Sequence, residues 1–368
     1  MAETSFAILL LSLATIILNV NADAGRPAVF ILGDSTADVG TNNFLPGSQA
    51  RADFPFNGVD FAFSIPTGRF SNGLNSADFL AKLLGYEKSP PPYLSTVNYS
   101  RYSLTRQALK GINFASGGSG IFRLTGQLPS DSPNGRKQNV IPMAEQIAQF
   151  ESIRSSLMAA MGPLPTLRFL SKSLFFISIG SNDIFEYYRS NNNLSKERFF
   201  ASLGFAYENQ LKALLELGAR KFGIISVPSI GCCPSQRLNS PNGGCLEELN
   251  DHARAFHTKI ERILYRLSEE YQGMKYSLGN AFEMTINVID NPLPYNFTNV
   301  KTACCGVGRL NAESNCNPNA NLCSSRNNYL FWDLFHPTEA AAQLAAVTLF
   351  RGPTRFVAPI NFSQLAQA

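Results

Sequence analysis

The feature that most constrains the fold is a series of short apolar segments separated by longer amphipathic ones. The clearest is Ser-Leu-Phe-Phe-Ile-Ser-Ile-Gly at residues 173–180, a pattern typical of a strand buried on both faces. Similar segments occur at residues 29–32, 111–115, 221–227 and 275–278. Strands that alternate with helices predict an α/β fold, with a central parallel sheet covered by helices on both faces in three α/β/α layers.

The segments between the apolar ones show helical periodicity. Helices are predicted at residues 76–84, 194–217, 246–271 and 338–350. No internal repeat or linker interrupts the alternation, so residues 25–368 are expected to form a single domain. With 45% hydrophobic and 16% charged residues, the composition is typical of a globular protein. The formal net charge is +4 and no run of Lys or Arg exceeds two residues, which excludes the basic clusters of a nucleic-acid surface.

The amino-terminal segment has the pattern of a secretory signal peptide. Residues 6–18 are apolar but too few to span a bilayer, and Ala-Asp-Ala at 22–24 matches a small-residue cleavage site. Residues 1–24 are therefore predicted to be a signal peptide, although Glu3 lies in its first region and no Lys or Arg does. A retained membrane anchor is the alternative, which the Ala-x-Ala ending disfavours. No other segment is long and apolar enough to cross a membrane, so no stable membrane insertion is expected.

Two further features are typical of an exported protein. Four Asn-x-Ser/Thr glycosylation sequons occur, a triplet that also arises by chance, at Asn98, Asn193, Asn296 and Asn361. All seven cysteines lie between residues 232 and 323 in polar loops, which in an oxidising compartment predicts disulfides of undetermined connectivity and one unpaired thiol. Because these loops lack His and the Cys-x-x-Cys spacing, a zinc site is disfavoured, and we expect no metal and no cofactor.

Ser35 is placed where a strand ends. It follows the apolar residues 29–32 within the triplet Gly-Asp-Ser at 33–35. Open α/β sheets place ligands at the carboxyl edge of their strands, so Ser35 is a candidate nucleophile. Asp34 and Ser35 are also common turn and helix-capping residues, and this stretch alone favours that interpretation.

Asp333 and His336 supply the two groups that activate a serine. A histidine takes the hydroxyl proton, and a carboxylate fixes its tautomer and stabilises its charged form. Residues three apart in a tight turn can face the same side. A solvated surface turn before the last helix is the alternative, which the segment alone does not decide. Because His252 and His257 flank the apolar stripe of residues 246–271 at a spacing unsuited to a metal pair, His336 is the candidate base.

Two more strand ends carry candidate residues. Small residues at 116–120 follow the strand at 111–115 and let backbone N–H groups face a ligand, unless they form only a surface loop. Ser-Asn-Asp at 181–183 follows the strand at 173–180, where Asn182 can be a functional amide or a structural cap. The aromatic-rich loop at 41–75 can line a pocket beside Ser35 or pack against the core.

These motifs resemble those of the GDSL lipases and esterases, the SGNH hydrolases, and most closely the plant-type branch. Four blocks occur in the family's order over nearly the whole mature chain: Gly-Asp-Ser at 33–35, Asn-Phe-Ala-Ser-Gly-Gly at 113–118, Gly-Ser-Asn-Asp at 180–183 and Asp-Leu-Phe-His at 333–336. The departures are Thr36, where the family has leucine, and Gly-Thr-Asn-Asn at 40–43 in place of Gly-Asn-Asn-Asn.

The resemblance implies a flavodoxin-like fold and a secreted serine esterase or lipase that acts through an acyl-enzyme. It implies that Ser35 attacks the ester, His336 is the base and Asp333 orients His336, with the Ser35 N–H, Gly118 and Asn182 in the oxyanion hole. No Gly-x-Ser-x-Gly occurs, which disfavours the α/β-hydrolase fold. The expected partner is a small-molecule or lipid ester of unspecified identity, and the sequence indicates no oligomeric state. An acyltransferase with the same residues is the first alternative; a non-catalytic binding protein is disfavoured because all three residues are present.

Overall fold

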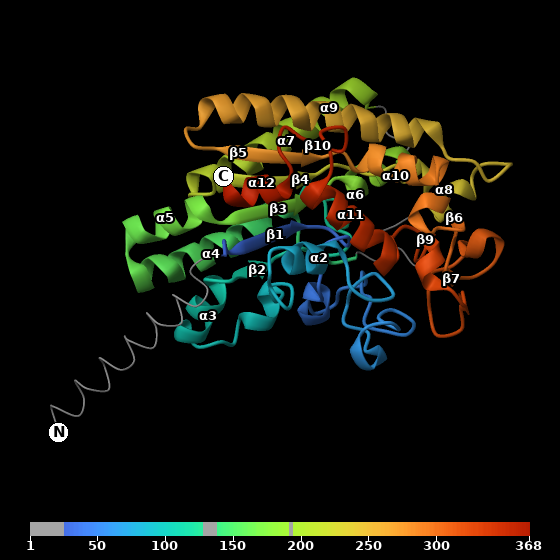
Figure 1. Ribbon diagram of the computed structural model, residues 1–368, viewed down its shortest axis with the longest axis horizontal. Coiled ribbons are helices and arrows are strands. Elements are labelled where there is room, and N and C mark those ends of the chain that lie inside the picture. Colours follow the sequence, from blue (N-terminus) through green and yellow to red (C-terminus); the bar gives the residue numbers. More distant parts are fainter. Residues whose placement is uncertain (1–25, 128–137, 191–193) are drawn as a thin grey trace.

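A computed structural model describes residues 26–127, 138–190 and 194–368 (Figure 1). Its main sheet has the strand order β10-β5-β4-β3-β1-β2, in which β10 is antiparallel and the other strands are parallel. The strands are β1 (Val29–Gly33), β2 (Gly111–Asn113), β3 (Leu174–Ser178), β4 (Lys221–Ile225), β5 (Lys275–Gly279) and β10 (Val357–Ala358). The parallel part, β2-β1-β3-β4-β5, has the flavodoxin-like order, as expected.

Helices cover both faces of this sheet in three layers (Figure 1). The first face lies against α4, α7 and α9, and the second against α2, α11 and α12. The helices are α2 (Ser76–Leu83), α3 (Arg101–Ala108), α4 (Met143–Met161), α5 (Pro163–Lys172), α6 (Ser181–Arg189), α7 (Lys196–Glu216), α8 (Pro234–Arg237), α9 (Glu247–Glu270), α10 (Ala281–Asp290), α11 (Glu339–Arg351) and α12 (Phe362–Gln367). Within the described ranges, no helix has the length and apolar character needed to cross a membrane.

The strands are apolar throughout because successive side chains point to opposite faces of the sheet and helices cover both faces. In β3, Phe175 packs on the first face and Phe176 on the second. On the first face Phe30 and Phe175 are register partners in β1 and β3, and their rings lie 5.2 Å apart. The Phe150 ring of α4 closes over both.

Several elements lie outside the sequence predictions, among them the long helix α4 and the edge strand β10. The buried stripe of α4 is interrupted near its start by Gln146, which weakens its apolar pattern. Gln146 is nevertheless fully buried, because its amide donates to the Gly33 carbonyl oxygen and accepts from the Gly33 N–H, both at 2.9 Å. The edge strand β10 is only two residues long and antiparallel to β5, too short to show a pattern.

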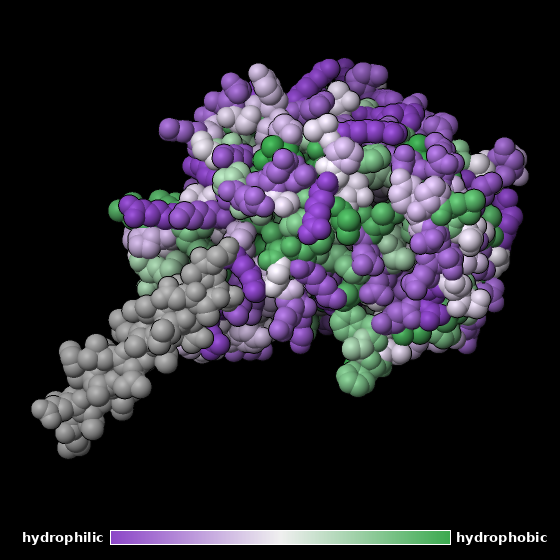
Figure 2. All heavy atoms as spheres, viewed as in Figure 1, coloured by the Kyte–Doolittle hydropathy of each residue, from purple (hydrophilic) through white to green (hydrophobic). Residues whose placement is uncertain are grey.

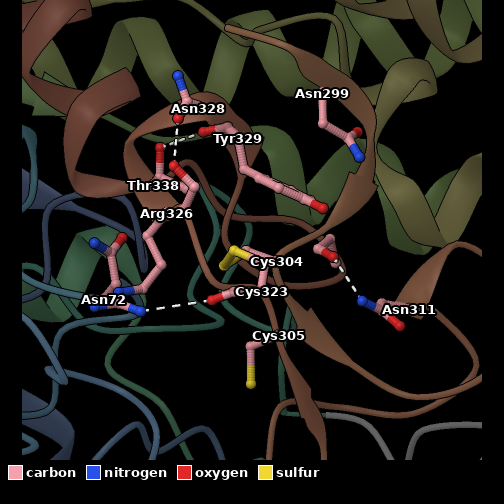
Figure 3. The surroundings of a disulfide bond; sticks show 12 residues. Asn72, Asn299, Cys304, Cys305, Asn311, Cys323, Arg326, Asn328, Tyr329 and Thr338 are labelled. Atoms are coloured by element: carbon pink, nitrogen blue, oxygen red, sulfur yellow. Dashed lines mark hydrogen bonds between the residues drawn. A yellow bond between two sulfur atoms is a disulfide. The ribbon is translucent and has the colours of Figure 1, made fainter.

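A cysteine-rich segment leaves the main sheet between α10 and α11. It contains β6 (Asn299–Ala303) parallel to β9 (Tyr329–Phe331), and β7 (Cys305–Gly306) antiparallel to β8 (Asn321–Leu322). Disulfides join Cys304 to Cys323 and Cys305 to Cys316, and a third joins Cys232 to Cys245. Figure 3 shows Cys304–Cys323, with the Arg326 guanidinium donating to the Cys323 carbonyl oxygen. The expected disulfides are confirmed, and Cys233 is the unpaired, buried thiol.

The predicted export signals are partly within the described residues. Asn98 and Asn296 are exposed, and Asn361 is partly exposed as the N-cap of α12. Asn193 and the expected signal peptide at residues 1–24 lie outside the described residues. Short 3₁₀ helices occur in the loops, at Thr41–Phe44, Ala62–Ser64, Tyr93–Thr96, Ile230–Cys232, Leu293–Tyr295, Arg309–Asn311 and Arg326–Asn328.

Candidate active site

Ser35, His336 and Asp333 form a continuous chain of hydrogen bonds, although 301 positions separate Ser35 from His336. The His336 Nε2 lies 2.7 Å from the Ser35 Oγ, and its Nδ1 lies 2.8 Å from the Asp333 Oδ2. The Asp333 Oδ1 also accepts from the N–H groups of Phe335 and His336, which fixes the carboxylate within its turn. The side chains of His336 and Asp333 are only 13% and 12% exposed, so this segment is not a solvated surface turn.

Gly33 explains how the chain presents Ser35 at the end of β1. Its φ is +153°, and a Cβ built there would lie 2.3 Å from the Ser178 carbonyl oxygen of β3, a contact that only glycine avoids. The chain then makes one tight turn, in which the Asp34 carbonyl oxygen accepts from the N–H groups of Ala37 and Asp38. Ser35 is therefore held above the carboxyl edge of the sheet, next to β3.

The electrostatic surroundings of His336 favour its charged form. Burial lowers the pKa of His336, but the Asp333 carboxylate, its hydrogen bond and the nearby Asp34 together hold the pKa above 6.5. Burial likewise raises the pKa of Asp333, but His336 and the hydrogen bonds of the turn outweigh it and hold the pKa below 3.8. The Phe70 ring lies 4.9 Å from the imidazole and shields this pair from water. The arrangement can take a proton from Ser35 and stabilise the resulting imidazolium.

Asp34 and Thr36 have structural roles beside Ser35. The Asp34 Oδ1 accepts from the N–H and hydroxyl groups of Thr36, as the turn interpretation predicts for an aspartate here. Burial raises the pKa of Asp34 although these bonds oppose the shift. The Thr36 hydroxyl lies 2.9 Å from that of Ser178, which ties the turn to β3. The departure from leucine at position 36 thus adds a polar link between two strands.

Gly118 and Asn182 line the same cavity as Ser35 and His336. Gly118 lies in the loop after β2 with φ +81°, whereas the N–H of its neighbour Gly117 donates to the Asp38 carboxylate at 2.8 Å. Asn182 lies in the first turn of α6, after β3. Its Nδ2 donates to the Ser119 carbonyl oxygen at 2.9 Å, which joins the two loops. The structure therefore brings together all the residues named for the catalytic triad and the oxyanion hole.

Two buried aspartates hold these loops, and the sequence motifs assign them no role. Asp38 accepts from the N–H groups of Gly40, Thr41 and Gly117, and burial raises its pKa to about 6. Asp183, in the same motif as Asn182, accepts from the N–H groups of two loop residues and from a hydroxyl: Ile121, Phe122 and Thr125. Burial raises the pKa of Asp183 to about 6 as well. Asp183 lies in the motif at 180–183 and Asp38 three residues after the Gly-Asp-Ser triplet, and these positions are the only sequence signal for this function.

The cavity at the site has a volume of about 730 Å³. Phe54 and Phe70 of the aromatic-rich loop line it, whereas Phe56 packs against the buried Trp332 and the disulfides. Phe63 of the same loop is 94% exposed. Figure 2 shows a hydrophobic projection at the place where Figure 1 has this blue loop. Both interpretations of the loop are therefore correct in part.

The other two histidines lie away from the cavity, on α9. His252 is buried against the aromatic rings of Tyr187 and Phe200, and burial lowers the pKa of both His252 and His257. In the part of the chain that the structure describes, no three His, Cys, Asp or Glu side chains come together as metal ligands. Of the three histidines, His336 alone lines the cavity beside Ser35.

Comparisons with known proteins agree with this geometry. Residues 29–348 match the family model described as GDSL-like lipase/acylhydrolase. A GDSL esterase/lipase of Arabidopsis thaliana is 39% identical over 349 residues, covering 93% of this chain and 90% of the relative. Two others from the same plant are 33% and 35% identical, covering 92% and 94% of this chain and 91% and 90% of their own. The four ordered motifs are thereby accounted for: the chain belongs to the GDSL-like lipase/acylhydrolase family, whose enzyme class is carboxylic ester hydrolase.

Proposed function

We propose that the protein is a secreted serine esterase or lipase, which hydrolyses carboxylic esters through an acyl-enzyme. The observation that carries this proposal is the hydrogen-bonded chain from Ser35 through His336 to Asp333. A serine hydroxyl is a weak nucleophile until a neighbouring base takes its proton, and the base needs a third group to orient it. His336 lies within hydrogen-bond distance of both Ser35 and Asp333, in a cavity large enough for a small ester.

The reaction has two steps of the same form. The Ser35 Oγ attacks the ester carbonyl carbon while the His336 Nε2 takes the hydroxyl proton, and Asp333 stabilises the imidazolium. His336 then gives that proton to the alkoxide leaving group, and the acyl group stays on Ser35. In the second step a water molecule attacks the acyl-enzyme, with His336 again as base, and releases the carboxylic acid and Ser35.

Three hydrogen-bond donors surround the position of the developing oxyanion in this proposal: the N–H groups of Ser35 and Gly118 and the side-chain amide of Asn182. Gly118 and Asn182 line the cavity beside Ser35. Because one Nδ2 hydrogen of Asn182 is held by the Ser119 carbonyl oxygen, its second hydrogen is already oriented before substrate binds. Donors that need no reorganisation contribute most to the rate.

Export is the second part of the proposal. Three disulfides are typical of a protein that folds in an oxidising compartment. We assign residues 1–24 to a signal peptide and residues 25–368 to one hydrolase domain. We expect glycans on exposed sequons such as Asn98 and Asn296. Amino-terminal sequencing and glycan mapping of the protein secreted from plant cells check this; an unprocessed chain in the cytosol would contradict it.

Covalent labelling tests the catalytic part. A fluorophosphonate probe should label Ser35 alone, as peptide mass spectrometry would show, and Ser35→Ala should remove both the label and hydrolysis of p-nitrophenyl butyrate. Ser181→Ala is the matched control, because Ser181 also lines the cavity but makes no hydrogen bond to His336 that the structure shows. It should keep the label at Ser35. Ser35→Ala activity within a factor of a few of the parent would contradict the proposal.

A further inference from the structure

The cavity extends far beyond Ser35, along the carboxyl edge of the main sheet. From Ser35 at the end of β1 its lining continues over Ser178 at the end of β3 and over Ile225 and Ser226 at the end of β4. It then passes between α10, which follows β5, and α11, which follows His336. The cavity therefore crosses three neighbouring strands and ends between two helices.

The two helices line this far part of the cavity with regularly spaced residues. The spacing i, i+3, i+4, i+7 places side chains on one face of a helix. The lining from α10 follows it, at Ala281, Met284, Thr285 and Val288. The lining from α11 follows it too, at Ala341, Leu344, Ala345, Thr348 and Leu349. We call the space between these two faces the α10–α11 channel; Leu330 and Phe356 also line it.

The channel walls offer no charge to a substrate, since no Asp, Glu, Lys or Arg of α10 or α11 lines the cavity. The few polar groups on these walls already have partners. The Thr285 and Thr348 hydroxyls donate to carbonyl oxygens of their own helices, and the Asn287 Nδ2 donates to the Tyr295 hydroxyl. Outside α10 and α11 the same cavity is also lined by polar residues, among them Gln49, Arg51, Gln138, Asn182 and Asn315.

We propose that the α10–α11 channel binds the linear hydrocarbon chain of the ester substrate. This rests on the proposed function, since the chain must belong to an ester that Ser35 attacks. The stripe from Ala341 to Leu349 is about 12 Å long, so it contacts several successive methylenes. Each methylene that leaves water for such a wall raises kcat/KM by about fourfold, because the same burial stabilises the transition state. The chain is either the fatty acyl group or a fatty alcohol, which share this chemistry.

Two series of esters test the channel and identify the source of the chain. The p-nitrophenyl esters from acetate to laurate vary the acyl chain, and alkyl acetates from ethyl to dodecyl vary the alcohol. In one series kcat/KM should rise on the order of a hundredfold over the four methylenes from butyl to octyl length, and then level off when the channel is full. The series that shows this rise identifies which half of the ester occupies the channel.

Variants of the channel walls complete the test. Ala345→Phe fills the channel and should reduce the octyl-to-butyl ratio of kcat/KM at least tenfold, while activity on the short ester stays within about threefold. Val347→Phe adds the same ring on the exposed side of α11, where Val347 is 43% exposed, and should leave the ratio unchanged. Met284→Ala widens the channel and should move the levelling-off to longer chains.

The outcomes separate this inference from the proposed function. Hydrolysis of short esters that depends on Ser35, with kcat/KM independent of chain length in both series, overturns the channel but leaves the esterase. A rise with chain length that Ala345→Phe does not change, while Ala345→Phe keeps its short-ester activity, also overturns the channel. Absence of hydrolysis of any ester by the folded parent overturns the esterase and the channel together.

Discussion

The two regions that supply the candidate active site are built in different ways. Ser35, Gly118 and Asn182 follow strands β1, β2 and β3, so the hydrogen bonding of the main sheet positions them. Asp333 and His336 follow β9, a strand outside that sheet, in a segment that contains two disulfides before β9. The position of Ser35 therefore depends on the register of the main sheet, whereas the positions of Asp333 and His336 depend on a segment that contains disulfides.

Buried polar side chains stabilise the strand-end region. Gln146, Asp38 and Asp183 each bond to backbone groups of a neighbouring loop. A buried carboxylate is costly unless its oxygens are hydrogen-bonded, and each of these two accepts three hydrogen bonds. Each loop is thus held by several hydrogen bonds to one buried side chain, and replacing that side chain would remove them all.

The cysteine-rich region is stabilised by fewer but stronger connections. The N–H groups of Cys304 and Cys305 donate to the carbonyl oxygens of Phe331 and Trp332, immediately before Asp333. The buried Trp332 indole donates to Asn57 at 2.9 Å, which anchors the segment to the aromatic-rich loop. Asp333 therefore follows a strand that is hydrogen-bonded to two disulfide-linked cysteines, whereas Ser35 follows a strand of the main sheet.

The largest expected effect comes from the disulfide-held side. Asp333→Asn should lower kcat/KM by about 10⁴-fold, because an amide stabilises the wrong imidazole tautomer. Circular dichroism should show an unchanged fold, since the turn and its disulfides remain. Asp290→Asn, an exposed aspartate at the end of α10, is the control and should keep parent activity. A loss of less than tenfold would remove Asp333 from the proposed triad.

Asn182→Ala tests the strand-end side. We expect kcat to fall on the order of a hundredfold, or about 3 kcal/mol, with little change in KM, because the oxyanion develops only in the transition state. The melting temperature should change little, since Asp183 still holds the neighbouring loop. An unchanged kcat with a lowered melting temperature would instead make Asn182 a purely structural residue.

The pH dependence of kcat/KM measures how Asp333 affects the proton affinity of His336, which must accept the Ser35 proton. His336 must be neutral to accept the Ser35 proton, and its pKa is held above 6.5. Below that pKa, kcat/KM should therefore fall about tenfold per pH unit, and above it level off. In Asp333→Asn the carboxylate that raises the pKa is gone, so the midpoint should move to lower pH. A midpoint below 6.5 in the parent, or an unchanged midpoint in the variant, would contradict this coupling.

Paired removal of disulfides separates stability from activity. Replacing Cys304 and Cys323 by serine opens a loop with a sequence separation of 19, and replacing Cys232 and Cys245 opens one of 13. Each pair should lower the free energy of unfolding by about 3 kcal/mol, as denaturant titration would show. Only the first pair should also lower kcat/KM at 25 °C, by a few fold, because it loosens the segment before Asp333. Equal effects on activity would refute the difference between the two regions.

The sequence predicts the regular parts of the fold because they repeat one local pattern. The parallel strands β1 to β5 and the helices α2, α7, α9 and α11 follow from apolar runs and amphipathic periods. The helix α4 does not, since Gln146 interrupts its stripe, and the pairing of seven cysteines depends on a loop path that no local pattern encodes.

The sequence likewise predicts some residues of the candidate site and misses others. Ser35, Asn182, Asp333 and His336 lie in recognisable motifs, and the structure brings them together. The supports Gln146 and Asp38 act on backbone groups more than 70 positions away, so no spacing reveals them. Their contributions become visible only when the loops are in contact.

The distance along the chain between Ser35 and His336 has a consequence for synthesis. A ribosome completes β1, β3 and β4 well before it reaches residue 336, so the nucleophile and the oxyanion donors emerge long before their base. Until its final tenth is translated, the chain has the proposed nucleophile but not its base, and the helices α11 and α12 that cover the second face of the sheet are also missing. The proposed catalytic group is therefore completed at the same stage of synthesis as the main sheet's second helical layer.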